Sequence, residues 1–368
     1  MEKTLKFAKQ NAVVIIAALC ALITSFIVPP DKEYLGYFDF KTLTCLFCVL
    51  AVVCALRNIR FFYTLAKAIV RKFGTARLAI LALVYITFIG SMLIANDMAL
   101  LTFLPLGYFV LHTTGKEKYM AFTFIMQNIA ANLGGMLTPF GNPQNLYLYS
   151  KFNIPDLEFV SIMFPPFIIA VTLITVCCLV FVKSEPLEIS ERAASLPIPR
   201  VVIYLLLFTL SILIVFRTVP YQLGLIVILL SLLFLDRQAL RDVDYGLLLT
   251  FVFFFIFSGN MARIPAVSEF FSSLLEIDTL VFSALSCQFI SNVPSAILLS
   301  QFTDNYRELL LGVNIGGVGS MISSLASLIT FKEYSKQDPG HTLRYILKFS
   351  AYNFAFLGIL ILFCAIIR

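Results

Sequence analysis

Two short polar segments interrupt otherwise apolar sequence, and their residue types could bind an ion or a small polar solute. Residues 127–146 read QNIAANLGGMLTPFGNPQNL, and residues 312–328 read GVNIGGVGSMISSLASL. A shift of 182 positions aligns an asparagine and a glycine pair in the two segments. Backbone inside a membrane leaves helical geometry only where protein or a water-filled cavity satisfies its freed amide and carbonyl groups. Matched interruptions in two halves of a chain therefore indicate a central binding site.

Glycine, asparagine, serine and threonine interrupt the apolar sequence in the two segments, which we interpret as helix breaks. Glycine allows backbones to approach closely, so we expect these residues to shape the site rather than to bind a ligand directly. The break residues are Gly134, Gly135, Pro139, Gly316 and Gly317.

Two further polar pairs, Asn96-Asp97 and Ser291-Asn292, lie in apolar stretches. The apolar arms on either side are short, which predicts two re-entrant helical hairpins with the polar pairs at their tips. Side-chain oxygen atoms of Asn and Ser, with carbonyl groups freed at the breaks, are ligands for a hard cation. The half-helices that follow would point their positive N-terminal ends at a bound anion.

Asp97 is the single acidic residue that we place at membrane depth, where a carboxylate is costly and often functional. It could ligate Na+ or carry a proton. The alternative is an ordinary helix cap in front of Met98. Asn96 and Asn292 could likewise be simple turn residues.

Composition places the chain in a membrane. Apolar residues make up 60% of it and charged residues 13%, about half the charged fraction of an ordinary soluble domain, and the mean hydropathy is +0.93. Lys and Arg lie almost entirely between apolar runs, so the net charge of +6 concerns membrane orientation rather than nucleic acid. The sequence contains no Ser/His, Cys/His or paired-acid pattern typical of an enzyme, and we expect no cofactor apart from a coupling ion.

The pattern predicts an all-α polytopic membrane protein with an inverted repeat. We expect about nine spanning helices, two of them broken at mid-membrane, with two re-entrant hairpins and two interfacial helices. The first half covers residues 1–182, a cytoplasmic linker covers 183–200, and the second half covers 201–368. The hairpins are predicted at 78–111 and 279–303, the broken helices at 119–149 and 309–331, and the interfacial helices at 57–77 and 260–278. The other spans are predicted near 11–28, 42–56, 159–182, 201–216, 221–235, 245–258 and 343–367.

The distribution of basic residues predicts the orientation. With a cytoplasmic N-terminus and an extracytoplasmic C-terminus, 19 Lys and Arg residues lie in inside segments and 7 in outside segments. This topology makes the two hairpins enter from opposite sides of a plasma (inner) membrane, which agrees with an inverted repeat.

Three motifs resemble the ion transporter superfamily of arsenite permeases, sodium/proton antiporters, citrate transporters and divalent-anion/sodium symporters. The segment IANDMALLTFLP, from Ile94 to Pro105, resembles an arsenite-permease hairpin. NLGGMLTPFGNPQN, from Asn132 to Asn145, resembles the first broken helix of the family, and SNVP, from Ser291, resembles its second hairpin motif. Ala95, Asp97 and Val293 depart from the Ser-Asn-Thr pattern of the symporters, and Asp97 is closer to the permease and antiporter pattern.

The resemblance implies where ions and substrate would bind. One cation site would use Ser91, Asn96 and Gly141, and a second would use Ser291, Asn292 and Ser323 near Cys287. The implied substrate-binding residues lie between them and are Asn96, Asp97, Asn142, Asn145, Asn292, Val293 and Ser324.

These observations lead to a principal hypothesis and two alternatives. The first is a secondary transporter of a small anion, a carboxylate or an oxyanion, coupled to Na+ or H+ by alternating access. The second is a cation/proton antiporter in which Asp97 carries the coupling proton. The third is a non-transporting membrane scaffold or pump subunit, against which the polar breaks argue. The expected partners are the anionic solute and the lipid bilayer, with a homodimer left open and no nucleic acid.

Overall fold

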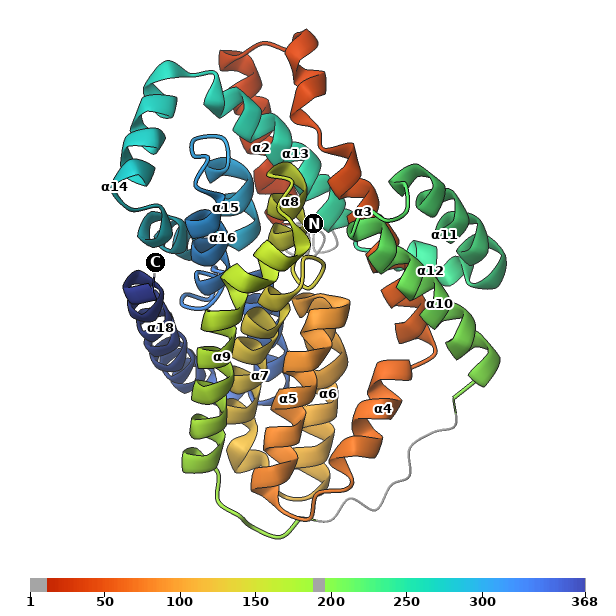
Figure 1. Ribbon diagram of the computed structural model, residues 1–368. Coiled ribbons are helices and arrows are strands. Elements are labelled where there is room, and N and C mark those ends of the chain that lie inside the picture. Colours follow the sequence, from red (N-terminus) through yellow and green to blue (C-terminus); the bar gives the residue numbers. More distant parts are fainter. Residues whose placement is uncertain (1–11, 188–195, 368) are drawn as a thin grey trace, which may run out of the picture.

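The computed structural model describes residues 12–187 and 196–367, which fold into helices joined by short turns (Figure 1). The predicted all-helical class is confirmed for this part of the chain. Residues 1–11 and the middle of the predicted linker lie outside the described residues. Long apolar runs become helices because a helix satisfies its backbone hydrogen bonds within the segment, which a bilayer demands.

The described residues form 17 α-helices and four short 3-10 helices. The first half contains α2 (Ala12–Ile27), η1 (Lys32–Tyr37), α3 (Phe40–Asn58), α4 (Phe61–Val70), α5 (Ala76–Ile94), α6 (Asn96–Thr113), η2 (Glu117–Tyr119), α7 (Met120–Gly134), η3 (Gly135–Leu137), α8 (Pro143–Lys151) and α9 (Asp156–Phe181). The second half contains α10 (Ile198–Val215), α11 (Tyr221–Leu235), α12 (Arg237–Arg241), α13 (Tyr245–Ala262), α14 (Pro265–Ile290), α15 (Asn292–Leu299), α16 (Tyr306–Ile315), α17 (Leu325–Gln337), η4 (Pro339–His341) and α18 (Thr342–Ile367).

Seven helices of the described residues are long and apolar enough to cross a membrane. They are Phe40–Asn58, Ala76–Ile94, Asp156–Phe181, Ile198–Val215, Arg237–Ala262, Pro265–Ile290 and Pro339–Ile367. Five of them overlap predicted spans, and the other two overlap the first arms of the predicted hairpins. The predicted spans near 11–28 and 221–235 are shorter apolar helices, α2 and α11.

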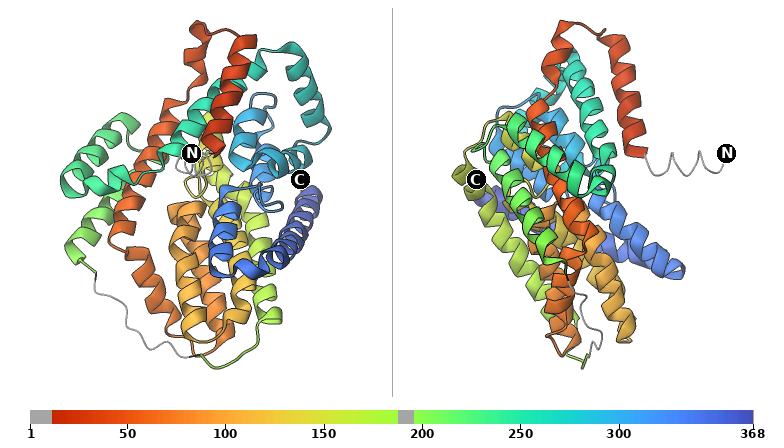
Figure 2. Two further views of the ribbon diagram at one scale, coloured as in Figure 1. Left: turned by 180° about the vertical axis from the view of Figure 1, so that it is seen from behind. Right: turned by 90° about the vertical axis from the view of Figure 1, so that its right-hand side faces the viewer.

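The two broken helices interleave the halves of the sequence. In the first half, α7 packs against α5 and α6, but α8 lies beyond its break and packs against α15 and α16. In the second half, α16 packs against α14 and α15, whereas α17 packs against α6 and α7. Figure 2 shows this arrangement from behind, with the blue α17 against the helices of the first half. Each broken helix therefore joins the two helical pairs α5–α6 and α14–α15 into one body.

A second group of helices lies beside this body. Helix α2 packs along α13, and α3 packs against α10, α11 and α12, which form the right-hand side of Figure 1. Contacts of α3 with α8 and of α13 with α15 connect the two groups.

The two predicted interfacial helices need correction. Residues 57–77 do not form one helix, because α3 continues to Asn58 and α4 covers only Phe61–Val70. Arg60 lies between them in the left-handed region, at φ 55° and ψ 29°. The predicted helix at 260–278 is likewise divided, since α13 continues to Ala262 and α14 begins at Pro265.

Asp278 marks the end of the predicted interfacial segment and the start of the second predicted hairpin. Its φ of −164° and ψ of 97° are not helical, so α14 is kinked at this residue. The kink divides a helix whose full length is sufficient to cross a membrane. The Asp278 side chain accepts a hydrogen bond from the amide of Val281 at 2.9 Å, as a helix cap does.

Candidate functional site

Two tight turns stand where the sequence predicts hairpin tips, and we call residues 95–97 and 291–293 the first and second tip. Ala95 joins α5 to α6 at φ 65° and ψ 150°, and Ser291 joins α14 to α15 at φ 72° and ψ 159°. This backbone region is almost reserved for glycine, so both tips hold local strain. Two non-glycine residues in the same rare conformation, each followed by asparagine, form equivalent structures.

The asparagine after each strained residue begins the next helix in the same way. The Oδ1 of Asn96 accepts a hydrogen bond from the amide of Asp97 at 3.0 Å, and the Oδ1 of Asn292 accepts one from the amide of Val293 at 2.9 Å. Helices α6 and α15 therefore start at the asparagines. Because α6 starts at Asn96, Asp97 does not occupy the cap position in front of Met98.

The first break (residues 135–142) is held open by one amide side chain. Helix α7 ends at Gly134, and α8 begins at Pro143. The Nδ2 of Asn145 donates to the carbonyl groups of Gly135, Met136 and Thr138 at 3.1, 3.2 and 3.2 Å. These carbonyl groups have lost their helical partners, so Asn145 satisfies the backbone that the break exposes.

The second break (residues 316–324) is satisfied mainly by Gln288, a residue that sequence reasoning missed. Its Nε2 donates to the carbonyl groups of Gly316 and Val318 at 2.9 and 3.2 Å, and its Oε1 accepts from the amide of Ser320 at 2.7 Å. Ser323 adds a bond from its Oγ to the carbonyl group of Gly317 at 2.9 Å. A lone glutamine three residues before the tip was the available signal, since a buried amide must find partners.

Each break is fastened to a tip-bearing helix by a hydroxyl group. The Oγ1 of Thr138 donates to the carbonyl group of Met92 at 2.7 Å, and the Oγ of Ser320 donates to that of Gln288 at 2.9 Å. Thr138 and Ser320 are the pair aligned by the shift of 182 positions. Both acceptors lie three residues before the strained residue of the tip.

Amide side chains connect the first tip with the two breaks across the two halves. The Nδ2 of Asn314 donates to the Oδ1 of Asn145 at 2.6 Å, and the Nδ2 of Asn142 donates to the Oδ1 of Asn314 at 3.3 Å. Asn96 extends this series of hydrogen bonds, since its Nδ2 donates to the Oδ1 of Asn132 at 3.2 Å. These five asparagines are buried, and so is Asn292; at most 3% of each residue is exposed. The first tip and the two breaks are therefore joined by one network of buried asparagines.

The centre of this network lies at Gly317, between the tips. A Cβ atom added there would stand 3.1 Å from the Nδ2 of Asn292 and 3.5 Å from the Oδ1 of Asn132. Gly135 is more constrained, since its Cβ would meet the Oδ1 of Asn142 at 2.4 Å. Glycine at these positions lets the breaks approach the tips.

The residues implied for the second cation site are joined directly. The backbone amide of Asn292 donates to the carbonyl group of Ser323 at 2.9 Å, and the Oγ of Ser291 donates to the same carbonyl group at 3.4 Å. Cys287 lies beside this set, with its Sγ 2.8 Å from the position of a Cβ on Gly316.

The residues implied for the first cation site lie around Gly134 and Gly135. Ser91 is buried and stands 2.6 Å, by its Oγ, from the position of a Cβ on Gly134. The carbonyl group of Gly141 stands 2.7 Å from the corresponding position on Gly135. Ion binding at either set stays a prediction.

The oxygen atoms near the tips and breaks that have no hydrogen-bond partner among the described residues include the Oδ1 of Asp97 and the Oδ1 of Asn142. Such buried acceptors are costly unless a ligand or water reaches them. Of the other residues implied for substrate, Val293 is half-buried, Ser324 caps α17 through the amide of Ser327, and Asn145 is engaged by the first break.

Sequence reasoning also missed a layer of amides behind the breaks. The Nε2 of Gln127 donates to the Oγ1 of Thr87 at 3.0 Å and the carbonyl group of Phe103 at 3.1 Å, and the Nδ2 of Asn128 donates to the Oδ1 of Asn353 at 3.3 Å. Gln127 and Asn128 open the first polar segment, but nothing in the sequence marks their partners.

Comparisons with known proteins agree with this architecture. A family model described as CitMHS, citrate transporter, matches residues 1–306. An uncharacterized transporter of Methanocaldococcus jannaschii is 31% identical over 301 residues, which cover 82% of each chain. The inner membrane protein YbiR of Escherichia coli is 28% identical over 319 residues, which cover 84% of each chain. The chain therefore belongs to the CitMHS citrate transporter family and is a multi-pass membrane transporter, not an enzyme.

Proposed function

We propose that this protein is a secondary active transporter of a small anion, a carboxylate or an oxyanion, coupled to Na+ or H+. The observation that carries the proposal is the pair of equivalent tips, with Asn96 bonded to a buried amide network and Asn292 beside Gly317. Helices α6, α8, α15 and α17 begin at these tips and breaks, and their N-terminal ends favour an anion. Membership in a transporter family argues against the scaffold alternative.

The equivalent tips and breaks support an inverted repeat in which α5–α6 and α14–α15 are re-entrant hairpins. The topology expected from charge, with a cytoplasmic N-terminus and an extracytoplasmic C-terminus in the plasma (inner) membrane, gains support from loop contacts. Each contact joins segments that this topology places on one side. The pairs are Glu185–Lys116 at 2.8 Å, Asn58–Asp236 at 3.4 Å, Arg263–Asp31 at 2.6 Å and Tyr306–Glu158 at 2.8 Å.

The second candidate is a cation/proton antiporter, and the unpartnered Oδ1 of Asp97 favours it. A carboxylate at that position could exchange a proton for Na+ without an anionic substrate. The two candidates differ in which variant abolishes the response to ligands.

Thermal stability of the purified protein tests both, because a ligand that binds the native state stabilises it by about 2.7 kcal/mol at a hundredfold excess over its dissociation constant. We expect Na+ to raise the melting temperature, citrate or another carboxylate to enlarge this Na+-dependent rise, and Asn292→Ala to remove the Na+-dependent part of the response. A response to Na+ or pH alone that Asp97→Asn removes would establish the antiporter instead. Asn58→Ala, at an exposed position, serves as the control.

A further inference from the structure

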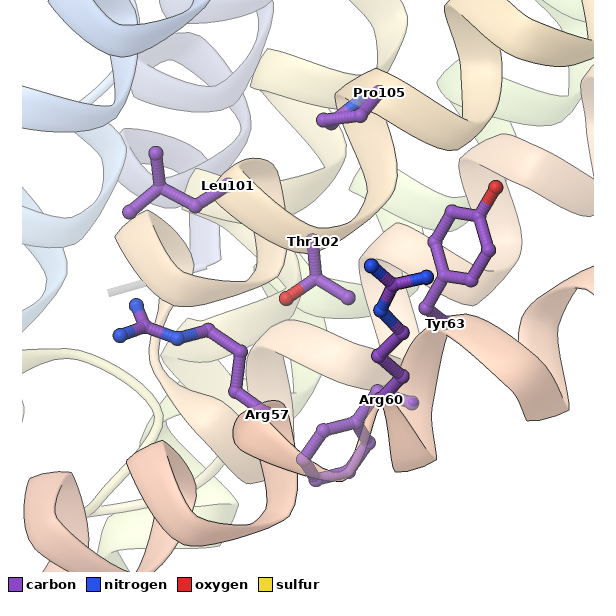
Figure 3. Close-up of a pocket in the computed structure, with 7 residues that line it drawn as sticks. Arg57, Arg60, Tyr63, Leu101, Thr102 and Pro105 are labelled. Carbon is purple, nitrogen blue, oxygen red and sulfur yellow. The ribbon is translucent and has the colours of Figure 1, made fainter. Parts of the chain in front are cut away.

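A cavity outside the tips and breaks is lined by two positively charged side chains. Its volume is about 460 Å³, within the range of roughly 300–1,000 Å³ typical of small-molecule sites. It lies between the end of α3, the start of α4 and the middle of α6 (Figure 3). Its lining residues are Arg57, Arg60, Phe62, Tyr63, Leu101, Thr102 and Pro105.

Both arginines lack an acidic partner. Among the described residues neither Arg57 nor Arg60 forms an ion pair, and no acidic side chain lines the cavity. Ion pairs of other basic residues in the described part of the chain include Lys116 with Glu185 at 2.8 Å and Arg263 with Asp31 at 2.6 Å. Two unpaired guanidinium groups beside one cavity leave their charge available to a ligand.

The backbone at Arg60 strengthens this interpretation. Its φ of 55° is in the left-handed region, where an L-residue with a long side chain costs about 1–2 kcal/mol and Gly or Asn is favoured. Arg60 also precedes the first residue of α4, an end of a helix where a cation is unfavourable. The local fold thus gives no reason for arginine at this position.

Arg57 connects the cavity with the first tip. Its Nη1 lies 3.5 Å from the Sδ of Met98, the second residue after Asn96 on α6. Leu101, Thr102 and Pro105 continue the same helix along the cavity. In Figure 3 Thr102 lies between the two arginine side chains, and its hydroxyl donates to the carbonyl group of Met98 at 2.8 Å. A solute held by the arginines would lie along the helix that begins at the tip.

We propose that Arg57 and Arg60 form an anion-binding site for a small carboxylate or oxyanion that carries more than one negative charge. Guanidinium groups bind such groups through paired, charge-assisted hydrogen bonds, which a single helix end cannot provide. This site rests on the proposed function in one respect, namely that its ligand is the transported solute. The arginines would bind that solute before it reaches the tips. The phosphate of an anionic lipid headgroup has the same chemistry, so the test must separate the two sources.

Binding of citrate and of inorganic phosphate is measured by thermal shift on full-length protein in neutral detergent. The protein carries Asn292→Ala, which disables the second tip. We expect citrate to stabilise this protein still, with affinity about tenfold lower for each arginine changed to Gln. Arg57→Lys should restore part of the affinity, and raised NaCl should weaken it. Arg71→Gln, exposed after α4 and outside the cavity lining, should change nothing.

Uptake into phosphatidylcholine vesicles separates this site from the transport function. We expect Arg57→Gln with Arg60→Gln to raise the KM for the anion and leave the maximal rate largely intact. Citrate binding that survives in this double variant would overturn the site, even if uptake still depends on Asn292. No uptake of any anion, with citrate binding that still depends on the arginines, would remove the transport function and keep the site. A difference between the variants that appears only with phosphatidylglycerol would assign the arginines to lipid and overturn the proposal.

Discussion

Ala95 and Ser291 show how single residues set the geometry of the tips. Both hold a backbone conformation almost reserved for glycine, at a cost of the order of 1–3 kcal/mol each. The hydrogen bonds from Thr138 and Ser320 fasten the breaks to the carbonyl groups of Met92 and Gln288, three residues away. These bonds maintain a strained turn that places the following asparagine in the network.

Substitution at Ala95 tests this account. We expect Ala95→Val to destabilise the protein by about 2–3 kcal/mol, because a β-branched side chain tolerates this φ even less well than alanine. Ala95→Gly should be neutral or stabilising, since relief of strain offsets the greater freedom of the unfolded chain. Thermal unfolding measures both.

Ala266→Val on the exposed face of α14 is the control and should cost less than about 1 kcal/mol. Equal effects of valine at residues 95 and 266 would show that the first tip stores no strain.

Among the elements, the segment after α9 is held by a charge cluster. Glu185 pairs with Lys116 at 2.8 Å and with Lys118 at 2.5 Å, and its backbone carbonyl accepts a bond from the amide of Ala76 at 2.8 Å. Hydrogen bonds from Lys116 and Lys118 lower the pKa of Glu185 to about 2. The start of the linker is thereby attached to the first residue of α5 and to the turn that follows α6.

This lowered pKa predicts a pH dependence with a definite sign. The Glu185 carboxylate stabilises the folded state above its ordinary pKa near 4.5, and the stabilisation is lost as pH falls from there to about 2. Glu185→Gln should therefore lower the melting temperature slightly at neutral pH and flatten its decline in this window. Because the cluster is exposed to solvent, high salt should reduce the difference. Glu117→Gln, between Lys116 and Lys118 in sequence, is the control. If the melting temperature of Glu185→Gln fell with pH as steeply as that of the unaltered protein, the assignment would be contradicted.

The sequence predicted most elements, and its errors have physical causes. Gly, Asn, Ser and Pro in apolar runs located the tips and breaks within two residues, because little else interrupts a membrane helix. The division near Arg60 was missed, since a left-handed arginine carries no Gly or Pro signal. Gln288 and Asn353 were missed because one amide in an apolar helix belongs to no motif. The crossing of α8 and α17 to the opposite helical pair depends on tertiary packing, which no local pattern encodes.

Taken as a whole, the molecule divides by packing rather than by sequence order. Helices α5–α8 and α14–α17 share the amide network, and α2, α3, α10, α11 and α13 stand beside it. We expect the first group to move as one body against the second during transport, because separating its two pairs would break the bonds of Asn314 to Asn142 and Asn145. The cavity with Arg57 and Arg60 lies at the boundary between α3–α4 and α6, where such motion would change its shape.

The bonds that join distant asparagines also bear on biosynthesis. Asn145 and Asn314 are 169 positions apart, and Asn128 and Asn353 are 225 positions apart. While the ribosome has released only the first half, these amides sit in the bilayer without their partners, at about 1–3 kcal/mol for each unsatisfied group. We therefore expect the nascent first half to be a substrate for quality control until its partners in the second half have been made. We expect a fragment of residues 1–195 to be degraded when produced alone, and to accumulate when residues 196–368 are co-expressed, with Asn314→Ala in the second fragment abolishing the rescue. Quantitative immunoblotting of the membrane fraction would follow this, and stable accumulation of the first fragment alone would refute it.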